Sequence, residues 1–108
     1  MKIKIYQIDM DRDLHRVKFQ GYEEMQKYQE SADIDASIYD RVFMGDVDCA
    51  GMEDVYRMFN TEGHRLHRGH SLSVSDIVEV EDGESAGFYF CDSIGFKKVP
   101  FHPEQTQK

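Results

Sequence analysis

The sequence predicts an α+β domain, with an antiparallel sheet of about four to five strands and two α-helices packed on one face. Two observations support this prediction. Short segments with alternating apolar residues, typical of strands, recur along the chain. Between them lie two segments whose apolar residues are spaced three or four positions apart, as on one side of a helix. The order strand, strand, helix, strand, helix, strand, strand offers too few helices for a three-layer α/β fold.

The N-terminal third is expected to contain two strands and the first helix. Isoleucines alternate with lysines at the start of residues 2–10, which favours a strand there. An acidic turn over residues 9–13 leads to a second expected strand, residues 15–19, and the two strands would form a hairpin. The first helix is expected over residues 22–30, where two tyrosines and a methionine fall on one side and charged residues on the other.

The middle third is expected to hold a loop, a strand and the second helix. Residues 31–37 are small and acidic, as in a loop, and residues 38–47 alternate in the manner of a strand. Residues 52–60 carry apolar side chains at positions i, i+3, i+4 and i+7, which is the clearest helical pattern in the chain. Residues 61–70 are polar and rich in histidine, and are expected to form a loop.

A β-hairpin is expected towards the C-terminal end. Ser73 is expected to begin a turn in which the Asp76 side chain accepts hydrogen bonds from freed backbone N–H groups. Strands are then expected over residues 77–80 and 88–93, because apolar residues predominate in the first and alternate in the second. The polar loop between them, residues 81–85, contains a glycine of the kind that a chain reversal needs.

Length and composition indicate a single domain over residues 1–99, followed by a flexible C-terminal tail, residues 100–108. No apolar run approaches the roughly 20 residues of a membrane span, and the opening residues do not resemble a signal peptide. We therefore expect a soluble, cytoplasmic protein. In such a reducing compartment Cys49 and Cys91 are expected to be free, partly buried thiols.

The charge distribution points to residues that could bind a partner. Residues 23–54 hold ten acidic and two basic residues, and the rest of the chain is balanced, so the entire net charge of −8 lies in this segment. Such a segment repels nucleic acid and attracts a basic surface, although a solvated, solubilising face is the alternative. Met52, Tyr56 and Phe59 could line a groove for a partner helix, but their spacing favours the core. The candidate partner-binding residues are Asp33, Asp35, Asp40, Asp46, Asp48, Glu53, Asp54, Arg65 and Arg68.

Alternate aspartates invite a calcium-binding interpretation of Asp9, Asp11 and Asp13. The pattern fails in detail, because the sixth position of the loop is leucine rather than glycine and the twelfth is glutamine rather than glutamate. Cys91 lies in a strand rich in aromatic residues and is expected to be a core thiol rather than a nucleophile. No glycine-rich phosphate loop or nucleophile elbow is visible. We therefore expect no catalytic residue, no metal site and no cofactor.

His64, His67 and His70 recur at every third position, with arginines between them. Three imidazoles could bind zinc, and a histidine pair could act as acid and base in a ribonuclease. Glycines at positions 63 and 69 disfavour the rigid helix that would align the three rings. A cationic loop that contacts a phosphate or an acidic surface is favoured over both functions, and a plain exposed loop is favoured over all three.

Several stretches in order resemble the YodL-like family, which comprises small bacterial domains common in conjugative and phage-like elements of Firmicutes. The resemblance is clearest at residues 71–80, SLSVSDIVEV, followed by residues 88–99, FYFCDSIGFKKV. Residues 2–13, 37–49 and 52–60 fit the same family. The resemblance implies no active-site residues, because the family has no established active site. Members are linked to modulation of cell shape through the bacterial actin cytoskeleton, and some similar proteins of mobile elements inhibit type II RNA-guided CRISPR nucleases.

Three functional hypotheses follow from the residues and the resemblance together. In the first, the chain is a counter-defence inhibitor, an anti-CRISPR protein whose acidic face mimics nucleic acid and binds a type II RNA-guided nuclease or its guide-RNA complex. In the second, it is a protein-interaction module that modulates the actin cytoskeleton and cell shape. In the third, it is a guide-RNA-directed ribonuclease that uses His64, His67 or His70. We adopt the first, with a protein partner and without direct DNA binding, membrane binding or a small-molecule substrate.

Overall fold

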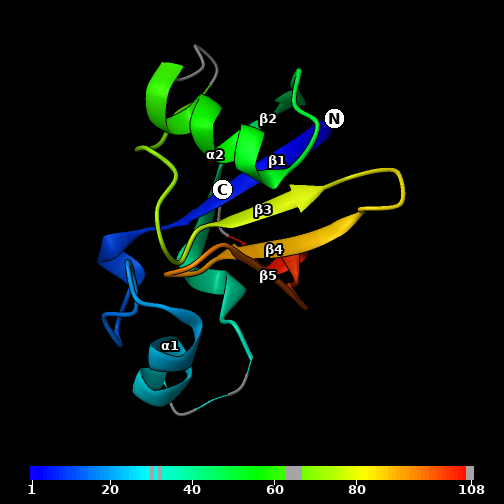
Figure 1. The fold of residues 1–108 in the computed structure, drawn as a ribbon. Coiled ribbons are helices and arrows are strands. Elements are labelled where there is room, and N and C mark those ends of the chain that lie inside the picture. The colour runs from blue at the N-terminus through cyan, green and yellow to red at the C-terminus, as the bar shows by residue number, and fades with distance from the viewer. Residues whose placement is uncertain (30, 32, 63–66, 107–108) are drawn as a thin grey trace.

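The computed structural model describes residues 1–29, 31, 33–62 and 67–106. Its centre is a five-stranded antiparallel sheet with the strand order β2-β1-β3-β4-β5 (Figure 1). The α+β class, the number of strands and the presence of two α-helices are confirmed. The elements are β1 (Lys2–Ile8), α1 (Tyr22–Gln29), β2 (Tyr39–Asp46), α2 (Met52–Arg57), β3 (Ile77–Val80), β4 (Gly87–Cys91) and β5 (Phe96–Val99).

The second helix extends over the whole of its expected range, because α2 continues directly into a π-helical turn, Met58–Glu62. The acidic residues in its first turn stabilise the helix, because their negative charges lie near the positive end of the helix dipole. One of them, Asp54, accepts a hydrogen bond from the backbone N–H of Ala50 across 2.9 Å. The apolar positions Val55 and Phe59 point towards the sheet and are buried.

The expected second strand, residues 15–19, is not a strand in the structure, so this part of the prediction is wrong. Both edges of β1 are occupied, by β2 on one side and by β3 on the other, and no edge is left for a hairpin partner. The Asp13 carboxylate instead accepts hydrogen bonds from the backbone N–H groups of Val17 and Lys18, each at 2.9 Å. These bonds hold the segment in a compact turn that buries Val17.

The C-terminal hairpin is confirmed, and the structure adds one strand that the sequence did not indicate. A tight turn follows β4, in which the Asp92 N–H donates to the Gly95 carbonyl across 2.9 Å. Gly95 has a φ of +69°, which glycine adopts without the strain that a side chain would cause. The chain then returns as β5, where Val99 pairs with Phe88. Two adjacent exposed lysines in the middle of this edge strand interrupt the alternation of apolar and polar residues by which a strand is predicted.

The two helices cover opposite faces of the sheet, which differs from the expected packing on one face. Adjacent residues of a strand point to opposite faces, and in β1 Ile5 and Tyr6 belong to different buried clusters. Val55 of α2 lies in the cluster of Ile5, whereas Met25 of α1 lies in that of Tyr6. Figure 1 shows α2 across the sheet and α1 beyond one of its ends. Both faces of the sheet carry buried apolar residues, so both need cover from other parts of the chain.

The segment after β5, expected to be a flexible tail over residues 100–108, contributes a side chain to the core. Phe101 is only 5% exposed. Its ring centroid lies 5.1 Å from that of Tyr6 and 5.3 Å from that of Tyr39. These contacts cover part of the sheet face that α1 leaves open, and a short 3-10 helix, Pro103–Gln105, follows them.

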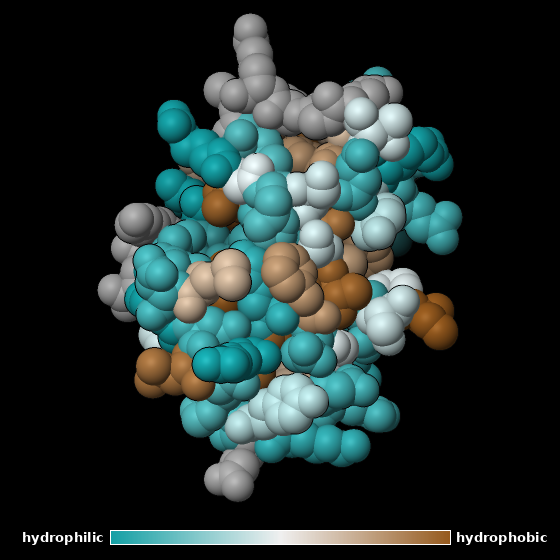
Figure 2. All heavy atoms as spheres, turned by 90° about the vertical axis from the view of Figure 1, so that its left-hand side faces the viewer, coloured by the Kyte–Doolittle hydropathy of each residue, from teal (hydrophilic) through white to brown (hydrophobic). Residues whose placement is uncertain are grey.

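The surface is largely hydrophilic. Figure 2 shows one face of the molecule, where hydrophilic side chains predominate and hydrophobic ones reach the surface in a few places. The exposed large hydrophobic residues are Met10, Leu14, Phe19, Tyr28, Met44, Tyr56 and Ile94. In the described part of the chain, no helix has the length and apolar character needed to cross a membrane.

Candidate functional site

The candidate acidic residues fall into two groups, one near each end of β2. The first group, Asp33, Asp35 and Asp40, precedes β2 or lies near its start. The second group lies at the end of β2 and at the start of α2, and we call it the β2–α2 acidic group. Its members are Asp46, Asp48, Glu53 and Asp54. Because a strand rises about 3.3 Å per residue, six residues separate Asp40 from Asp46 by roughly 20 Å. The structure therefore does not bring all seven acids to one place.

The β2–α2 acidic group is a local concentration of charge around Cys49. Burial raises the pKa of the Cys49 thiol, and the nearby carboxylates of Asp54 and Asp48 raise it further. These two residues, on either side of the turn into α2, thus act on the same side chain. Asp46, whose side chain is 67% exposed, lies 3.0 Å from the amino group of Met1.

Several of the acids already have a partner within the chain. Asp40 lies 2.5 Å from Arg12, and its side chain is only 18% exposed. Asp54 lies 3.4 Å from Arg57. By contrast, Asp33, Asp48 and Glu53 are exposed and form no ion pair with any residue that the structure describes. Asp35 is likewise exposed and forms no ion pair with a described residue, and its carboxylate accepts a hydrogen bond from the Ser37 N–H at 3.1 Å. The charges that remain available to a partner are therefore those of Asp48 and Glu53 in the β2–α2 acidic group and of Asp33 and Asp35 elsewhere.

Of the two candidate arginines, Arg65 lies outside the described residues, as does His64. Arg68 is exposed, and its backbone N–H donates to the carbonyl of Val42 across 2.8 Å. This hydrogen bond places Arg68 beside β2, at the edge of the sheet. The structure thus puts one basic side chain on the side of β2 that faces away from β1.

Of the three candidate histidines, the two that the structure describes, His67 and His70, are held by backbone carbonyls. The Nε2 atom of His67 lies 2.6 Å from the carbonyl oxygen of His70, and the Nδ1 atom of His70 lies 2.6 Å from that of Ser71. The His67 ring packs against Phe59, with the ring centroids 5.1 Å apart. Burial lowers the pKa of His70. Among the described residues, no group of three or more histidines, cysteines or acids is arranged to hold a metal ion.

The alternate aspartates of the first turn are used locally. Asp9 accepts a hydrogen bond from the Asp11 N–H at 2.9 Å, and its second oxygen lies 2.6 Å from Arg12. Asp13 binds the two backbone N–H groups described above. The carboxylates of Asp9 and Asp13 thus stabilise the chain near them, and Arg12 joins this turn to Asp40 of β2.

A buried polar cluster lies between β1, β3 and the segment before β3. The Gln7 side chain donates to the Asp76 carboxylate at 2.9 Å and to the His70 carbonyl at 3.0 Å. Asp76 also accepts a hydrogen bond from the Ser73 N–H at 2.7 Å, as expected for the turn, whereas the Ser73 hydroxyl donates to the Ser71 carbonyl at 2.9 Å and does not cap it. Burial raises the pKa of the Asp76 carboxyl to about 7. Because Asp76 is fully buried, this carboxyl cannot touch a substrate and acts within the fold.

Ser75, next to Asp76, has a φ of +84°, which is unusual for a residue with a side chain. Its carbonyl accepts a hydrogen bond from the Tyr39 hydroxyl at 2.7 Å, and its hydroxyl accepts one from the Phe19 N–H at 3.0 Å. These bonds hold the strained backbone in place. Phe19 itself has a φ of +70° and is 52% exposed.

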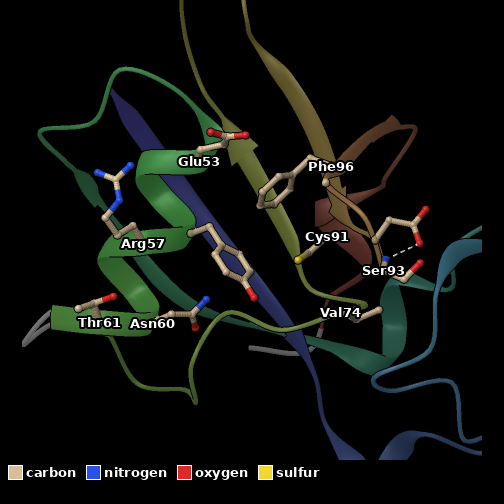
Figure 3. Close-up of a pocket in the computed structure, with 11 residues that line it drawn as sticks. Glu53, Arg57, Asn60, Thr61, Val74, Cys91, Ser93 and Phe96 are labelled. Carbon is tan, nitrogen blue, oxygen red and sulfur yellow. Dashed lines mark hydrogen bonds between the residues drawn. The ribbon is translucent and has the colours of Figure 1, made fainter.

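A cavity of about 530 Å³ lies between α2 and the turn that joins β4 to β5 (Figure 3). We call it the α2–β5 groove. Tyr56, 46% exposed, and Phe96 form its aromatic part, and the sulfur of Cys91 points into it from β4. The residues that line it are Glu53, Tyr56, Arg57, Asn60, Thr61, Val74, Cys91, Asp92, Ser93, Gly95 and Phe96. No local pattern in the sequence indicates it, because Tyr56 and Phe96, on its two walls, lie forty residues apart in the chain.

The helical spacing of Met52, Tyr56 and Phe59 suggested either a groove or the core, and one of the three residues does line the groove. Phe59 is buried in the core, as its helical spacing favours, and Met52 packs against the same cluster. Tyr56 instead turns towards the groove, where its ring centroid lies 6.4 Å from that of Phe96.

The two cysteines are both free thiols.

Comparison with known proteins places these features in a family context. A family model described as a YodL-like domain matches residues 2–101. No curated protein and no solved structure matches the chain. The matched range contains all five strands and both α-helices, so the match covers the whole fold rather than one motif.

Proposed function

This chain belongs to the YodL-like family, and we propose that it acts as a stoichiometric binding protein on a basic partner surface. The observation that supports the proposal is the β2–α2 acidic group. Within it, Asp48 and Glu53 are exposed and unpaired with any described residue, so a partner's lysines or arginines can reach them. The net charge of −8 adds long-range attraction to such a surface.

The partner that we propose is a type II RNA-guided nuclease or its guide-RNA complex. Such nucleases hold nucleic acid in a positively charged channel, and a dense acidic group competes for that channel by mimicking phosphate charge. In this role the chain is a counter-defence inhibitor carried by a mobile genetic element and acts in the cytoplasm. The carboxylates near Asp48 are the part of the surface best suited to it, since Asp40 is already paired with Arg12.

Modulation of cell shape through the actin cytoskeleton is the second candidate function. It requires binding through a hydrophobic surface, and the α2–β5 groove is the observation that favours it. The ribonuclease hypothesis gains no such support from the described residues. His67 and His70 each have one ring nitrogen directed at a backbone carbonyl. The ribonuclease hypothesis is therefore kept only as one possible result of the experiments below.

The inhibitor proposal is tested by capturing the nuclease, with and without guide RNA, on the immobilised protein at two salt concentrations. We expect capture at low salt that falls steeply at high salt, because screening weakens exposed charge pairs. The double variant Asp48→Asn with Glu53→Gln should weaken binding by about tenfold, equivalent to about 1.4 kcal/mol. Capture that does not depend on salt, or a double variant that binds like the parent, would contradict the electrostatic mechanism.

The matched control is the double variant Asp82→Asn with Glu84→Gln. It removes the same two charges from the exposed loop between β3 and β4 and leaves Asp48 and Glu53 unchanged. We expect it to bind like the parent. Two further readouts separate the alternatives: altered cell shape after expression in a host without a CRISPR system supports the second candidate, and shortened guide RNA supports a ribonuclease.

A further inference from the structure

We infer that the α2–β5 groove binds a protein segment whose apolar anchor is a pair of large apolar side chains flanked by lysine or arginine. This inference rests on the proposed binding function and specifies a second contact surface for it. It shares Glu53 with the β2–α2 acidic group, and its other residues are different.

The interior of the groove suits an apolar side chain. Tyr56 and Phe96 present aromatic rings, and Cys91, which is 3% exposed, closes the floor. A volume of about 530 Å³ lies within the usual range of roughly 300 to 1,000 Å³ for binding cavities. In Figure 3 Cys91 and Phe96 face α2 across the open space. A leucine, methionine or phenylalanine inserted there would leave water and contact three apolar walls.

The apolar surface continues beyond the rim of the groove. Ile94, at the tip of the turn between β4 and β5, is 92% exposed, and its neighbours Ser93 and Gly95 line the groove. The turn conformation that places it there depends on the positive φ of Gly95. A small molecule confined to the groove would leave Ile94 in water. A polypeptide that crosses the turn covers both, which favours a protein segment.

The charges at the rim favour basic residues in that segment. Glu53 lies on the α2 side of the groove and Asp92 on the strand side, so negative charge stands on both walls. The positive charge of Arg57 is offset by Asp54, which lies 3.4 Å away. Lysine or arginine on either side of the apolar anchor would meet these acids. A second copy of the chain fits poorly, because two molecules of net charge −8 repel each other.

The test is a titration of isotope-labelled protein, followed by NMR, with a synthetic peptide that has a central Leu-Phe pair and two lysines on each side. We expect saturable shifts of the backbone signals of Tyr56, Cys91 and Phe96. Tyr56→Ala should weaken binding by about tenfold or more, as expected for an exposed aromatic anchor. Tyr28→Ala is the matched control: Tyr28 is an exposed tyrosine on α1, and its removal should change the affinity less than twofold.

Two further peptides test the stated chemistry. Glutamates in place of the lysines, or serines in place of the Leu-Phe pair, should each abolish saturable shifts in the groove. Equal binding by the glutamate peptide, shifts confined to other regions, or equal affinities of the Tyr56→Ala and Tyr28→Ala proteins would overturn the inference. If Tyr56→Ala still captures the nuclease like the parent and the lysine peptide leaves the groove unchanged, the groove inference fails while the proposed function stands. If the lysine peptide binds in the groove but the parent protein does not capture the nuclease, the groove inference stands and the nuclease is not the partner.

Discussion

Gln7 and Asp76 face each other inside the core, and the Gln7 Nε2 atom donates to the Asp76 carboxylate across 2.9 Å. The same Gln7 amide pairs with His70 in both directions, since it donates to the His70 carbonyl and accepts from the His70 N–H at 3.1 Å. One side chain thus joins β1 to the turn before β3 and to the segment that precedes it.

Asp76 should make stability fall as pH rises towards neutrality. Burial raises its pKa from 3.8 to about 7, so between these values the folded chain keeps a proton that the unfolded chain has released. The contribution is fully present below about pH 4 and is lost as pH approaches 7. The loss is on the order of 4 kcal/mol, at about 1.4 kcal/mol per pKa unit. Asp76→Asn should remove this slope, as urea unfolding at several pH values would reveal. A variant with the slope of the parent would refute the assignment.

Arg12 should contribute more to stability than a typical surface arginine. Its guanidinium lies 2.6 Å from Asp9 and 2.5 Å from Asp40, and it also donates to the Ser37 carbonyl at 3.1 Å. Arg12→Ala should lower the free energy of unfolding by about 2 kcal/mol. Arg57→Ala is the comparison, because its one ion pair is exposed and should be worth less than about 1 kcal/mol. Urea denaturation measures both, and equal losses would argue against the network.

Gly69 should not tolerate a side chain. A Cβ at this position would lie 1.9 Å from Oε1 of Gln7 and 3.1 Å from Cβ of Val42. Because hydrogen bonds fix the Gln7 side chain, Gly69→Ala should cost about 2 kcal/mol or more. Gly51→Ala meets no atom within 4 Å and should cost less than about 1 kcal/mol. Thermal denaturation of the two variants is the measurement, and similar melting temperatures would contradict the prediction.

The two cysteines should react at different rates in the folded protein. Cys91 is 3% exposed, and burial raises its pKa to about 12, so little of it is thiolate at neutral pH. Cys49 is partly exposed, although its pKa is also raised. Iodoacetamide should therefore modify Cys49 at least about tenfold faster than Cys91, as peptide mass spectrometry would show. In concentrated urea the difference should disappear. Equal rates in the folded state would mean that β4 opens readily.

Part of the candidate site could be found from the sequence, because charge is visible in the residues themselves. The acidic excess of residues 23–54 is a matter of composition, and the Ser73 turn follows from side-chain chemistry within four residues. Whether each acid is free to bind a partner or is already paired within the chain could not be predicted in this way. Asp40 is paired with an arginine 28 positions away, whereas Glu53 is unpaired with any described residue. Such pairing depends on how the chain folds back on itself.

The sequence by itself determined the local elements: β1, α1, β2, α2, β3 and β4 each follow from a pattern a few residues long. Periodicity and turn chemistry act between neighbours, which explains why these elements were predictable. Only the tertiary structure decided that residues 15–19 form a turn, that the helices lie on opposite faces and that the acids divide between the two ends of β2. It also decided the burial of Asp76 and the position of the α2–β5 groove. These features depend on contacts between distant segments, which no local pattern records.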